Sequence, residues 1–307
     1  MLAATDALAL SNLDLGIIVC YLAASVVIGL LANRVTTGLR GYLVAGQSLG
    51  TALSVATMTG SELGLITVMY QAQKGFTGGF AALHIGVIAG LVAAFVGLTG
   101  LIVVPLRRAG VMTIPEFYER RFSRKTRVLG GTLLAVGGLL NMGLFLRIGS
   151  QFLVAVTGLD PSGGMLPMIM TGLLALVLVY TVLGGMVSVV LTDYIQFVVL
   201  SAGLLLTTYL LLQQFGLDAL FATVDTHLGM AGLDPTRGEA GFGPGYISWM
   251  AVLGLVSVAI WPTAVSRALS ARDTEVVKRQ YLLSSIGFLV RFMLPCLLGI
   301  CALTWLT

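Results

Sequence analysis

Four ionisable residues lie well inside segments that are otherwise apolar: Glu62, Arg147, Asp193 and Arg291. A charge near the centre of a bilayer costs about 2.5–3.5 kcal/mol even on a lenient insertion scale. Such side chains face a charged partner or an aqueous cavity, so they are candidates for binding a polar solute or an ion. An arginine suits bidentate recognition of a carboxylate. Two arginines against one glutamate therefore favour an anionic or zwitterionic solute.

The depths of these residues can be compared along their helices. A rise of about 1.5 Å per residue places Glu62 about 21 Å, Arg147 about 27 Å and Arg291 about 16 Å from the cytoplasmic ends of their segments. Asp193 is about 9 Å deep by the same measure. The first three could share one chamber, while Asp193 lies nearer the cytoplasm. The alternative for Glu62 and Arg147 is a buried structural ion pair.

The segments that carry these charges predict an integral membrane protein. The 307 residues are 57% hydrophobic and 10% charged, whereas soluble domains are about a quarter charged. A spanning helix needs about 20 apolar residues. The first apolar segment is not a signal peptide, because its upstream flank is acidic and has no basic residue. Eight candidate spans lie at about 12–32, 48–70, 79–104, 129–157, 165–183, 187–212, 245–266 and 280–306.

The distribution of basic residues predicts the orientation. Of the 17 Lys and Arg, 13 fall in three loops, at 34–40, 107–127 and 267–279. Alternating the eight spans puts these loops on one side, which the positive-inside rule makes cytoplasmic, with both termini external. The net charge of +4 therefore indicates topology and not a nucleic-acid partner. Within the second loop we expect a short interfacial helix over 114–122.

The second span is expected to be broken. Its stretch "SVATMTGSELG" combines small, β-branched and hydroxyl residues around Gly60 and Gly64, with few strong helix formers. An unwound helix within the membrane is tolerated where it lines a cavity, and there its carbonyls can coordinate a cation. Glu62 would then face water and solute beside Ser61. The alternative is a packing helix kinked at its glycines.

The cysteines and the other reactive residues of the sequence give little support for an enzyme. The three cysteines all lie in apolar segments, without metal-ligand spacing, and the chain has no HExxH motif and no evident nucleophile–base pair. No organic cofactor is expected. His84, about five residues inside the third span, is more typical of a hydrogen-bonded structural histidine than of a proton carrier.

The stretch "YTVLGGMVSVVLTDYIQ" (180–196) resembles the signature of the sodium:solute symporter family, and 41–50, 261–279 and 295–302 are similar to other parts of it. The resemblance implies an all-α, multi-pass fold of the leucine-transporter type in a single domain. An extra helix (about 12–32) would precede a five-helix repeat (about 48–212) and the start of an inverted repeat (about 245–307). The signature residues are Tyr180, Thr181, Gly184, Gly185, Thr192, Asp193 and Gln196.

The resemblance also implies an ion site. The backbone carbonyls of Ala56 and Thr59 resemble the family's sodium ligands on its first core helix. Asp193 matches an aspartate that in some members helps sodium to bind or to leave toward the cytoplasm. The alternative for Asp193 is a cap at the start of a helix.

For the solute, the resemblance implies a second set of residues. Glu62 falls where sugar-transporting members place a substrate-contacting glutamate, and Arg291 where they place a lysine. Arg147 resembles an arginine with which sialic-acid-transporting members hold a carboxylate. Gly60, Ser61 and His84 complete the predicted solute site. Two departures put a sugar in doubt, since Ser257 replaces a gating tyrosine and Trp261 replaces a glutamine.

The expected function is sodium-coupled symport of a small polar solute by alternating access in the cell membrane, and the arginines favour a solute that bears a carboxylate. The partners would be sodium, the solute and lipid. The sequence ends after eight of at least eleven family helices, so the helix with the remaining sodium ligands is not in it, and we expect a fragment or a truncated product. The alternatives are a solute-sensing module that does not transport, and a proton-coupled carrier that uses Glu62, His84 or Asp193. The oligomeric state is not predicted.

Overall fold

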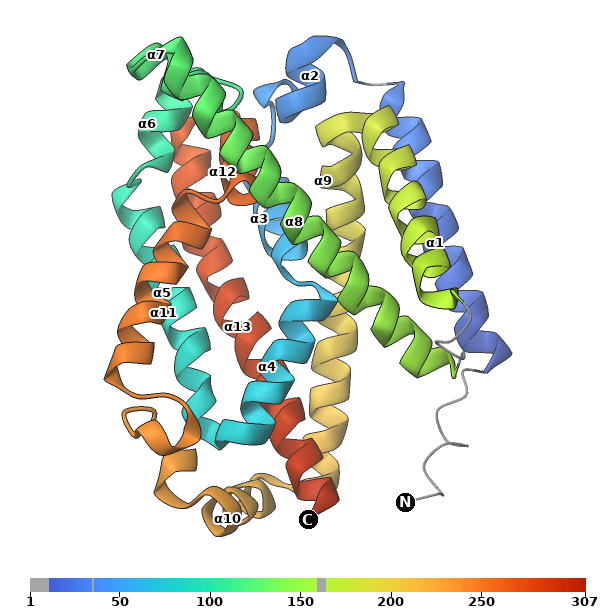
Figure 1. Cartoon of the computed structure of the whole chain (residues 1–307), viewed down its shortest axis with the longest axis vertical. Coiled ribbons are helices and arrows are strands. Elements are labelled where there is room, and N and C mark those ends of the chain that lie inside the picture. The colour runs from blue at the N-terminus through green and yellow to red at the C-terminus, as the bar shows by residue number, and fades with distance from the viewer. Residues whose placement is uncertain (1–10, 35, 159–163) are drawn as a thin grey trace. The chain divides into compact units, whose positions relative to one another are not determined.

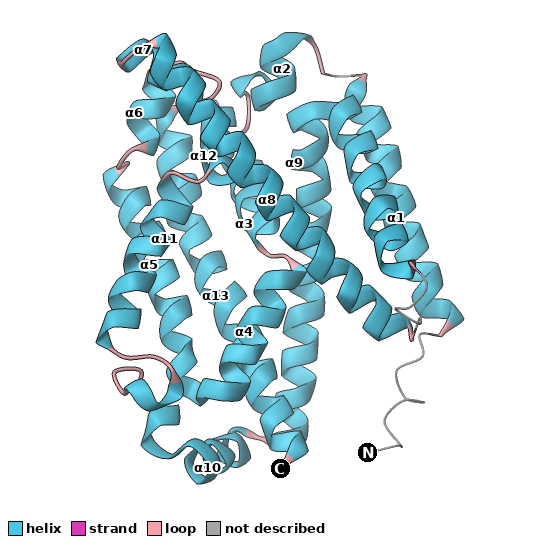
Figure 2. Ribbon diagram, in the orientation of Figure 1, coloured by secondary structure: helices cyan, strands magenta, loops and turns pink. Residues whose placement is uncertain are grey.

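The computed structural model describes residues 11–34, 36–158 and 164–307, and these residues are almost entirely helical (Figure 2). The described residues contain no strand, and one isolated backbone bridge joins Leu49 to Ala271. The upstream flank of the first span and the side chain of Tyr180 lie outside what is described.

The chain divides into two compact units, and the first comprises residues 1–46 and 115–192. Within it, the first part of α9 runs beside α1 in Figure 1. The contact is close, because a Cβ on Gly184 would lie 2.8 Å from the carbonyl oxygen of Gly29. The helices of this unit are α1 (Asn12–Asn33), α2 (Gly38–Val44), η2 (Ala45–Gln47, at its edge), most of α7 (Ile114–Arg121), α8 (Arg124–Thr157) and α9 (Met165–Phe215) up to Thr192.

The second unit comprises residues 47–114 and 193–307. Figure 1 shows α4 and α5 lying along α13, which is the longest helix that belongs wholly to this unit. Its helices are α3 (Thr51–Glu62), α4 (Leu65–Gly78), η3 (Gly79–Leu83), α5 (His84–Thr99), α6 (Val103–Arg108), the rest of α9, α10 (Leu217–Leu228), η4 (Gly229–Gly232), η5 (Gly238–Ala240), α11 (Pro244–Ala259), α12 (Pro262–Ser270) and α13 (Thr274–Leu306).

Four described helical runs are long and apolar enough to cross a membrane, or five when α11 and α12 count as one bent span. One of these runs, Leu65–Thr99, contains Gly79, whose φ of +58° ends α4. The count of eight spans and the external N-terminus stay predictions. The short helix expected over 114–122 is found as α7, and its position at the membrane interface stays a prediction.

One candidate span is bent. The segment at 245–266 changes direction by 42° where α11 meets α12. Proline lacks a backbone N–H and disfavours helix in the residue before it. Pro262 therefore begins α12, and Trp261 before it has an extended backbone (φ −62°, ψ 134°).

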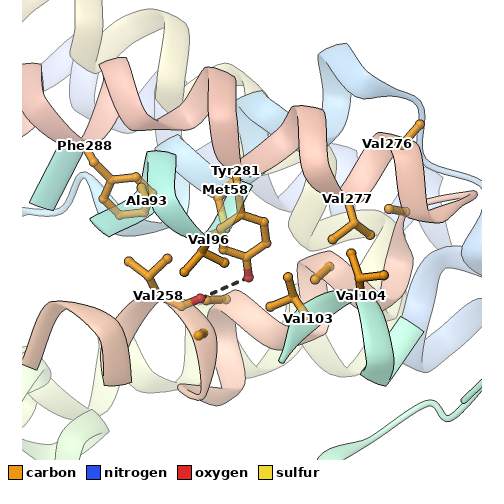
Figure 3. Close-up of a cluster of buried hydrophobic side chains, with 14 residues drawn as sticks. Met58, Ala93, Val96, Val103, Val104, Val258, Val276, Val277, Tyr281 and Phe288 are labelled. Atoms are coloured by element: carbon orange, nitrogen blue, oxygen red, sulfur yellow. Dashed lines mark hydrogen bonds between the residues drawn. The ribbon is translucent and has the colours of Figure 1, made fainter. Parts of the chain in front are cut away.

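The second unit is held by an apolar core that joins α3, α5, α6, α11 and α13 (Figure 3). Met58 of α3 and Phe288 of α13 are both almost fully buried in it. The hydroxyl of the fully buried Tyr281 donates a 3.0 Å hydrogen bond to the carbonyl oxygen of Val258. This bond satisfies the one polar atom of a large aromatic side chain, as burial requires. The core thus fixes α3 against α13.

Glycines let α4 and α13 approach unusually closely. A Cβ on Gly75 would lie 2.0 Å from the carbonyl oxygen of Cys296, and one on Gly299 would lie 1.8 Å from that of Ala72. Within lipid, small residues at such crossings supply the packing that holds helices together. Both glycines are needed for the observed crossing.

We expect Gly299→Ala to destabilise the protein by about 1–3 kcal/mol or more, because the added methyl group meets backbone and the helices must separate. Thermal unfolding in a mild detergent measures the change. Gly143→Ala in α8 is the control, because a Cβ at that position would have no heavy atom within 4 Å and alanine is favoured in helices by roughly 0.5–1 kcal/mol. Equal melting of Gly299→Ala and the unsubstituted protein would contradict this packing.

Candidate solute and ion site

The predicted break in the second span is confirmed, and it lies at Leu63 and Gly64. Helix α3 ends at Glu62, Leu63 (φ −91°, ψ 83°) and Gly64 (φ −118°, ψ 168°) are not helical, and α4 begins at Leu65. The N–H of Leu63 closes α3 by donating to the carbonyls of Thr59 and Gly60. The break therefore comes one turn later than the centre of the small-residue stretch.

Side chains from other helices satisfy the carbonyl oxygens at this break. Arg291 Nη1 donates to the carbonyl of Glu62 at 2.5 Å, and Thr67 Oγ1 donates to the same oxygen at 3.2 Å. Gln196 Nε2 donates to the carbonyl of Leu63 at 3.3 Å. An unpaired carbonyl away from water costs free energy, so α13 and α9 stabilise the open backbone. Gln196 is thus a signature residue that acts at the break.

The structure brings Glu62 and Arg291 together. Arg291 Nη1 lies 3.1 Å from Glu62 Oε2, and the side chains of the arginine and the glutamate are 8% and 22% exposed respectively. The guanidinium is stacked between the rings of Phe288 and Phe292, 4.4 Å from each centroid. Its Nε is buried without a partner among the described residues. The arginine therefore keeps one donor unused while Glu62 balances its charge.

Arg147 is not part of this ion pair. It lies in α8 of the first unit, where its side chain is exposed. Within the second unit Glu62 pairs with Arg291, and the ion pair considered for Glu62 and Arg147 stays a prediction. The depths predicted from the sequence do not distinguish which of two arginines on different helices pairs with Glu62.

A cavity of about 350 Å³ adjoins the break. Thr59, Leu63 and Arg291 line it, together with Ser201 and apolar side chains of α9 and α13. Ligand cavities are typically apolar with a few placed polar groups and begin at about 300 Å³. The volume and lining are those of a site for a small molecule.

A second buried ion pair, between α9 and α12, contacts helix α3. Asp193 Oδ2 accepts hydrogen bonds from Arg267 Nη2 (2.8 Å) and Thr57 Oγ1 (2.6 Å). Arg267 also donates to the carbonyls of Thr57 (3.4 Å) and Thr263 (3.0 Å). Both charged residues are more than nine-tenths buried. The cluster ties α3, α9 and α12 together.

Two expectations about this cluster are corrected. Asp193 lies inside α9, two turns beyond the break at Gly185, so it does not cap a helix start. Arg267, which the charge distribution assigns to a cytoplasmic loop, is buried in α12. The apolar neighbours Ala264, Val265, Ala268 and Leu269 are the signal for burial in the sequence "AVSRALS".

The carbonyls predicted to bind sodium lie in α3. Ala56 and Thr59 are both buried within the helix, and the carbonyl of Thr59 accepts the N–H of Leu63. They therefore do not belong to the unwound backbone, which is limited to Leu63 and Gly64. A carbonyl oxygen has two lone pairs, so a hydrogen-bonded one retains a second for an ion.

The rest of the predicted solute site has distinct surroundings. Gly60 packs on α9, because a Cβ there would lie 2.5 Å from the carbonyl of Asp193. Ser61 Oγ donates to the carbonyl of Met58 in the last turn of α3. His84 Nδ1 is 2.5 Å from the carbonyl of Ala81, and its ring packs edge-on against Phe242. These contacts are those expected of a hydrogen-bonded structural histidine.

The glycines of the signature form a chain reversal in α9. Gly185 has φ +58° and ψ −150°, which L side chains rarely adopt, and a Cβ there would lie 2.7 Å from the Tyr42 ring. Thr36 Oγ1 donates to the carbonyl of Gly184 at 3.1 Å. Thr192 donates back to carbonyls of its own helix, and Thr181 lies in the helix before the turn.

Comparison with known proteins settles the family. A model of the sodium:solute symporter family matches residues 42–305. The chain belongs to this family. As a sodium:solute symporter family member it is a multi-pass membrane protein of a transporter family, and the expectation that it is not an enzyme is confirmed by that membership.

Relatives within the sodium:solute symporter family include a sodium/glucose cotransporter from Vibrio parahaemolyticus, 28% identical over 225 residues (70% of this chain, 39% of the relative). The high-affinity proline transporter PutP of Bacillus subtilis is 28% identical over 269 residues (82% and 53%). The chain thus spans about two fifths to one half of the length of these relatives.

A solved structure also resembles this family member. It is described as the substrate-bound outward-open state of a Na+-coupled sialic acid symporter. It aligns with a TM-score of 0.81 at 17% identity, covering 96% of this chain and 61% of that one. The predicted all-α fold of the leucine-transporter type is confirmed.

Proposed function

We propose that the protein takes part in sodium-coupled symport of a small, polar, carboxylate-bearing solute across the cell membrane. The observation that carries this proposal is the break between α3 and α4, where an acidic and a basic side chain meet beside a cavity. In the proposed organisation, the chain is one transport domain that includes the extra helix, a first repeat and the start of a second.

The proposed solute site centres on the two charges at the break. Glu62 and Arg291 neutralise each other in the structure. An amino acid zwitterion offers the complementary pair, an ammonium for the carboxylate and a carboxylate for the guanidinium, so neither protein charge is left unpaired. The unused Nε of Arg291 adds a second donor for bidentate carboxylate binding. The proposed solute site also includes Gly60, Ser61 and His84. Arg147 is proposed as a further partner for the carboxylate of the solute.

The proposed sodium site uses oxygen atoms of α3. The carbonyls of Ala56 and Thr59 are hard ligands of the kind that alkali and alkaline-earth cations select. The hydroxyl of Thr57, which lies between them in sequence, hydrogen-bonds Asp193. The carboxylate is therefore coupled to the proposed ligand segment, which suits a role in sodium binding or release. Further oxygen ligands would have to complete the coordination.

Uptake into proteoliposomes tests the proposal. A panel of radiolabelled amino acids, other carboxylates, sugars and polyols is offered to the chain, and to any longer gene product that contains it, under an inward sodium gradient. We expect sodium-dependent accumulation of at least one carboxylate-bearing solute. Uptake that a proton gradient drives equally well without sodium would favour the proton-coupled carrier. Saturable binding without uptake by the longest product would favour the sensing module.

A further inference from the structure

Helices α7 and α8 of the first unit pack closely against each other at their junction. A Cβ on Gly130 of α8 would lie 2.7 Å from the ring of Tyr118, so that ring packs directly on the helix backbone. Pro115 lies over the neighbouring Gly131. Glu119 of α7 forms an ion pair with Arg127 of α8. These contacts hold the basic end of α7 against the start of α8.

Some of the charges at the junction of α7 and α8 are not neutralised. Arg120 pairs with Glu116, and Arg127 pairs with Glu119. The three other basic residues, Arg121, Arg124 and Lys125, are exposed, and no described residue gives them an acidic partner. We call these three residues the basic cluster. It lies at the positive end of the α8 dipole, which further favours an anion.

An open face of α8 begins at this cluster and continues onto apolar surface. It is formed by Arg124, Lys125, Val128, Leu129 and Thr132, which lie on one side of the helix. Val128 and Leu129 are 61% and 63% exposed. None of the most apolar stretch of α8 is buried. Beyond its charged start, this helix therefore has an apolar surface suited to contact with lipid chains. This face of α8 is therefore charged at one end and apolar at the other.

We propose that this face of α8 binds an acidic phospholipid, with the phosphate on the basic cluster and an acyl chain along Val128 and Leu129. The positive-inside rule places the cluster at the cytoplasmic leaflet, where acidic lipids attract basic residues beside a spanning helix. A soluble phosphate would use the charges but not the apolar half of this face. The proposal is independent of sodium-coupled transport, because it concerns surface of the first unit alone.

Native mass spectrometry of the detergent-solubilised protein tests this proposal. Phosphatidylglycerol and phosphatidylcholine with identical acyl chains are titrated separately. We expect tighter binding of phosphatidylglycerol, and we expect the double substitution Arg124→Gln/Lys125→Gln to weaken it by roughly tenfold. The control is Arg272→Gln/Arg279→Gln, which removes the same charge from residues that already pair with Asp273 and Glu275. It should leave phosphatidylglycerol binding unchanged.

Three outcomes would overturn the lipid site. Equal binding of the two lipids would remove the headgroup preference, and equal weakening by both double variants would show a general charge effect. Displacement of phosphatidylglycerol by millimolar glycerol phosphate would show that the cluster selects a soluble phosphate. Circular dichroism of each variant establishes that it is folded before its lipid binding is compared.

Discussion

Arg267→Ala is expected to lower the free energy of unfolding by about 3–5 kcal/mol, because it leaves the Asp193 carboxylate buried without its countercharge. The substitution also removes donors from the carbonyls of Thr57 and Thr263. Both partners are more than nine-tenths buried, so bulk water does not reach the carboxylate to stabilise its charge. Denaturant unfolding in a mild detergent measures the effect.

The double variant Asp193→Asn/Arg267→Met separates the ion pair from general packing. Replacing a buried pair by neutral groups of similar volume is often close to neutral, so the double variant should recover most of the lost stability. Arg272→Ala is the matched control, because that arginine's side chain is exposed and its ion pair, among the described residues, is with its neighbour Asp273. A change below about 1 kcal/mol for Arg267→Ala, the size typical of surface pairs, would contradict the buried cluster.

Arg291→Gln is expected to reduce sodium-dependent uptake of the best carboxylate solute by about 30-fold or more, since truncating one partner of a buried charge pair costs about 2–5 kcal/mol. Two losses contribute. The solute carboxylate loses its guanidinium, and the carbonyl of Glu62 loses a donor that supports the break. Initial uptake rates in proteoliposomes give the result, with thermal stability measured on the same preparations.

The double variant Glu62→Gln/Arg291→Gln distinguishes a solute site from a purely structural ion pair. It carries no unpaired charge, so its stability should return close to that of the unsubstituted protein. If the pair also binds the solute, uptake stays low although stability is restored. Recovery of both quantities in the double variant would assign the pair a structural role only.

The sequence predicts features that depend on local backbone chemistry. Gly64, among small and β-branched residues, indicates a break in the second span, and the paired Gly184 and Gly185 indicate the end of one span and the start of the next. Both are found: Gly185 has a φ of +58°, which favours glycine, and Gly64 is a poor helix former at the extended break. The short helix starting near Pro115 is predictable because proline suits the first turn of a helix.

Features that depend on which helices meet were not predictable. The predicted depths along the spans allow Glu62 to pair with either of two arginines, and only the packing of α3 on α13 shows its pairing with Arg291. Likewise, Arg267 is a basic residue near a charged turn, and the sequence does not show that Asp193, 74 residues earlier, neutralises it. The bend at Trp261 is signalled by Pro262, but that signal is outweighed by the apolar run that continues through it.

The central claim is that the break between α3 and α4 opens onto water on the path of ion and solute, and cysteine labelling tests it most directly. Ser61→Cys is introduced after Cys20, Cys296 and Cys301 are replaced by alanine, and its reaction with a membrane-impermeant, water-soluble thiol reagent is timed in proteoliposomes. Leu139→Cys, at an exposed apolar position of α8, serves as the lipid-facing control. We predict that the cysteine at 61 reacts much faster than the control and that sodium chloride slows it relative to choline chloride. A reaction no faster than that at 139, and indifferent to sodium, would contradict the account.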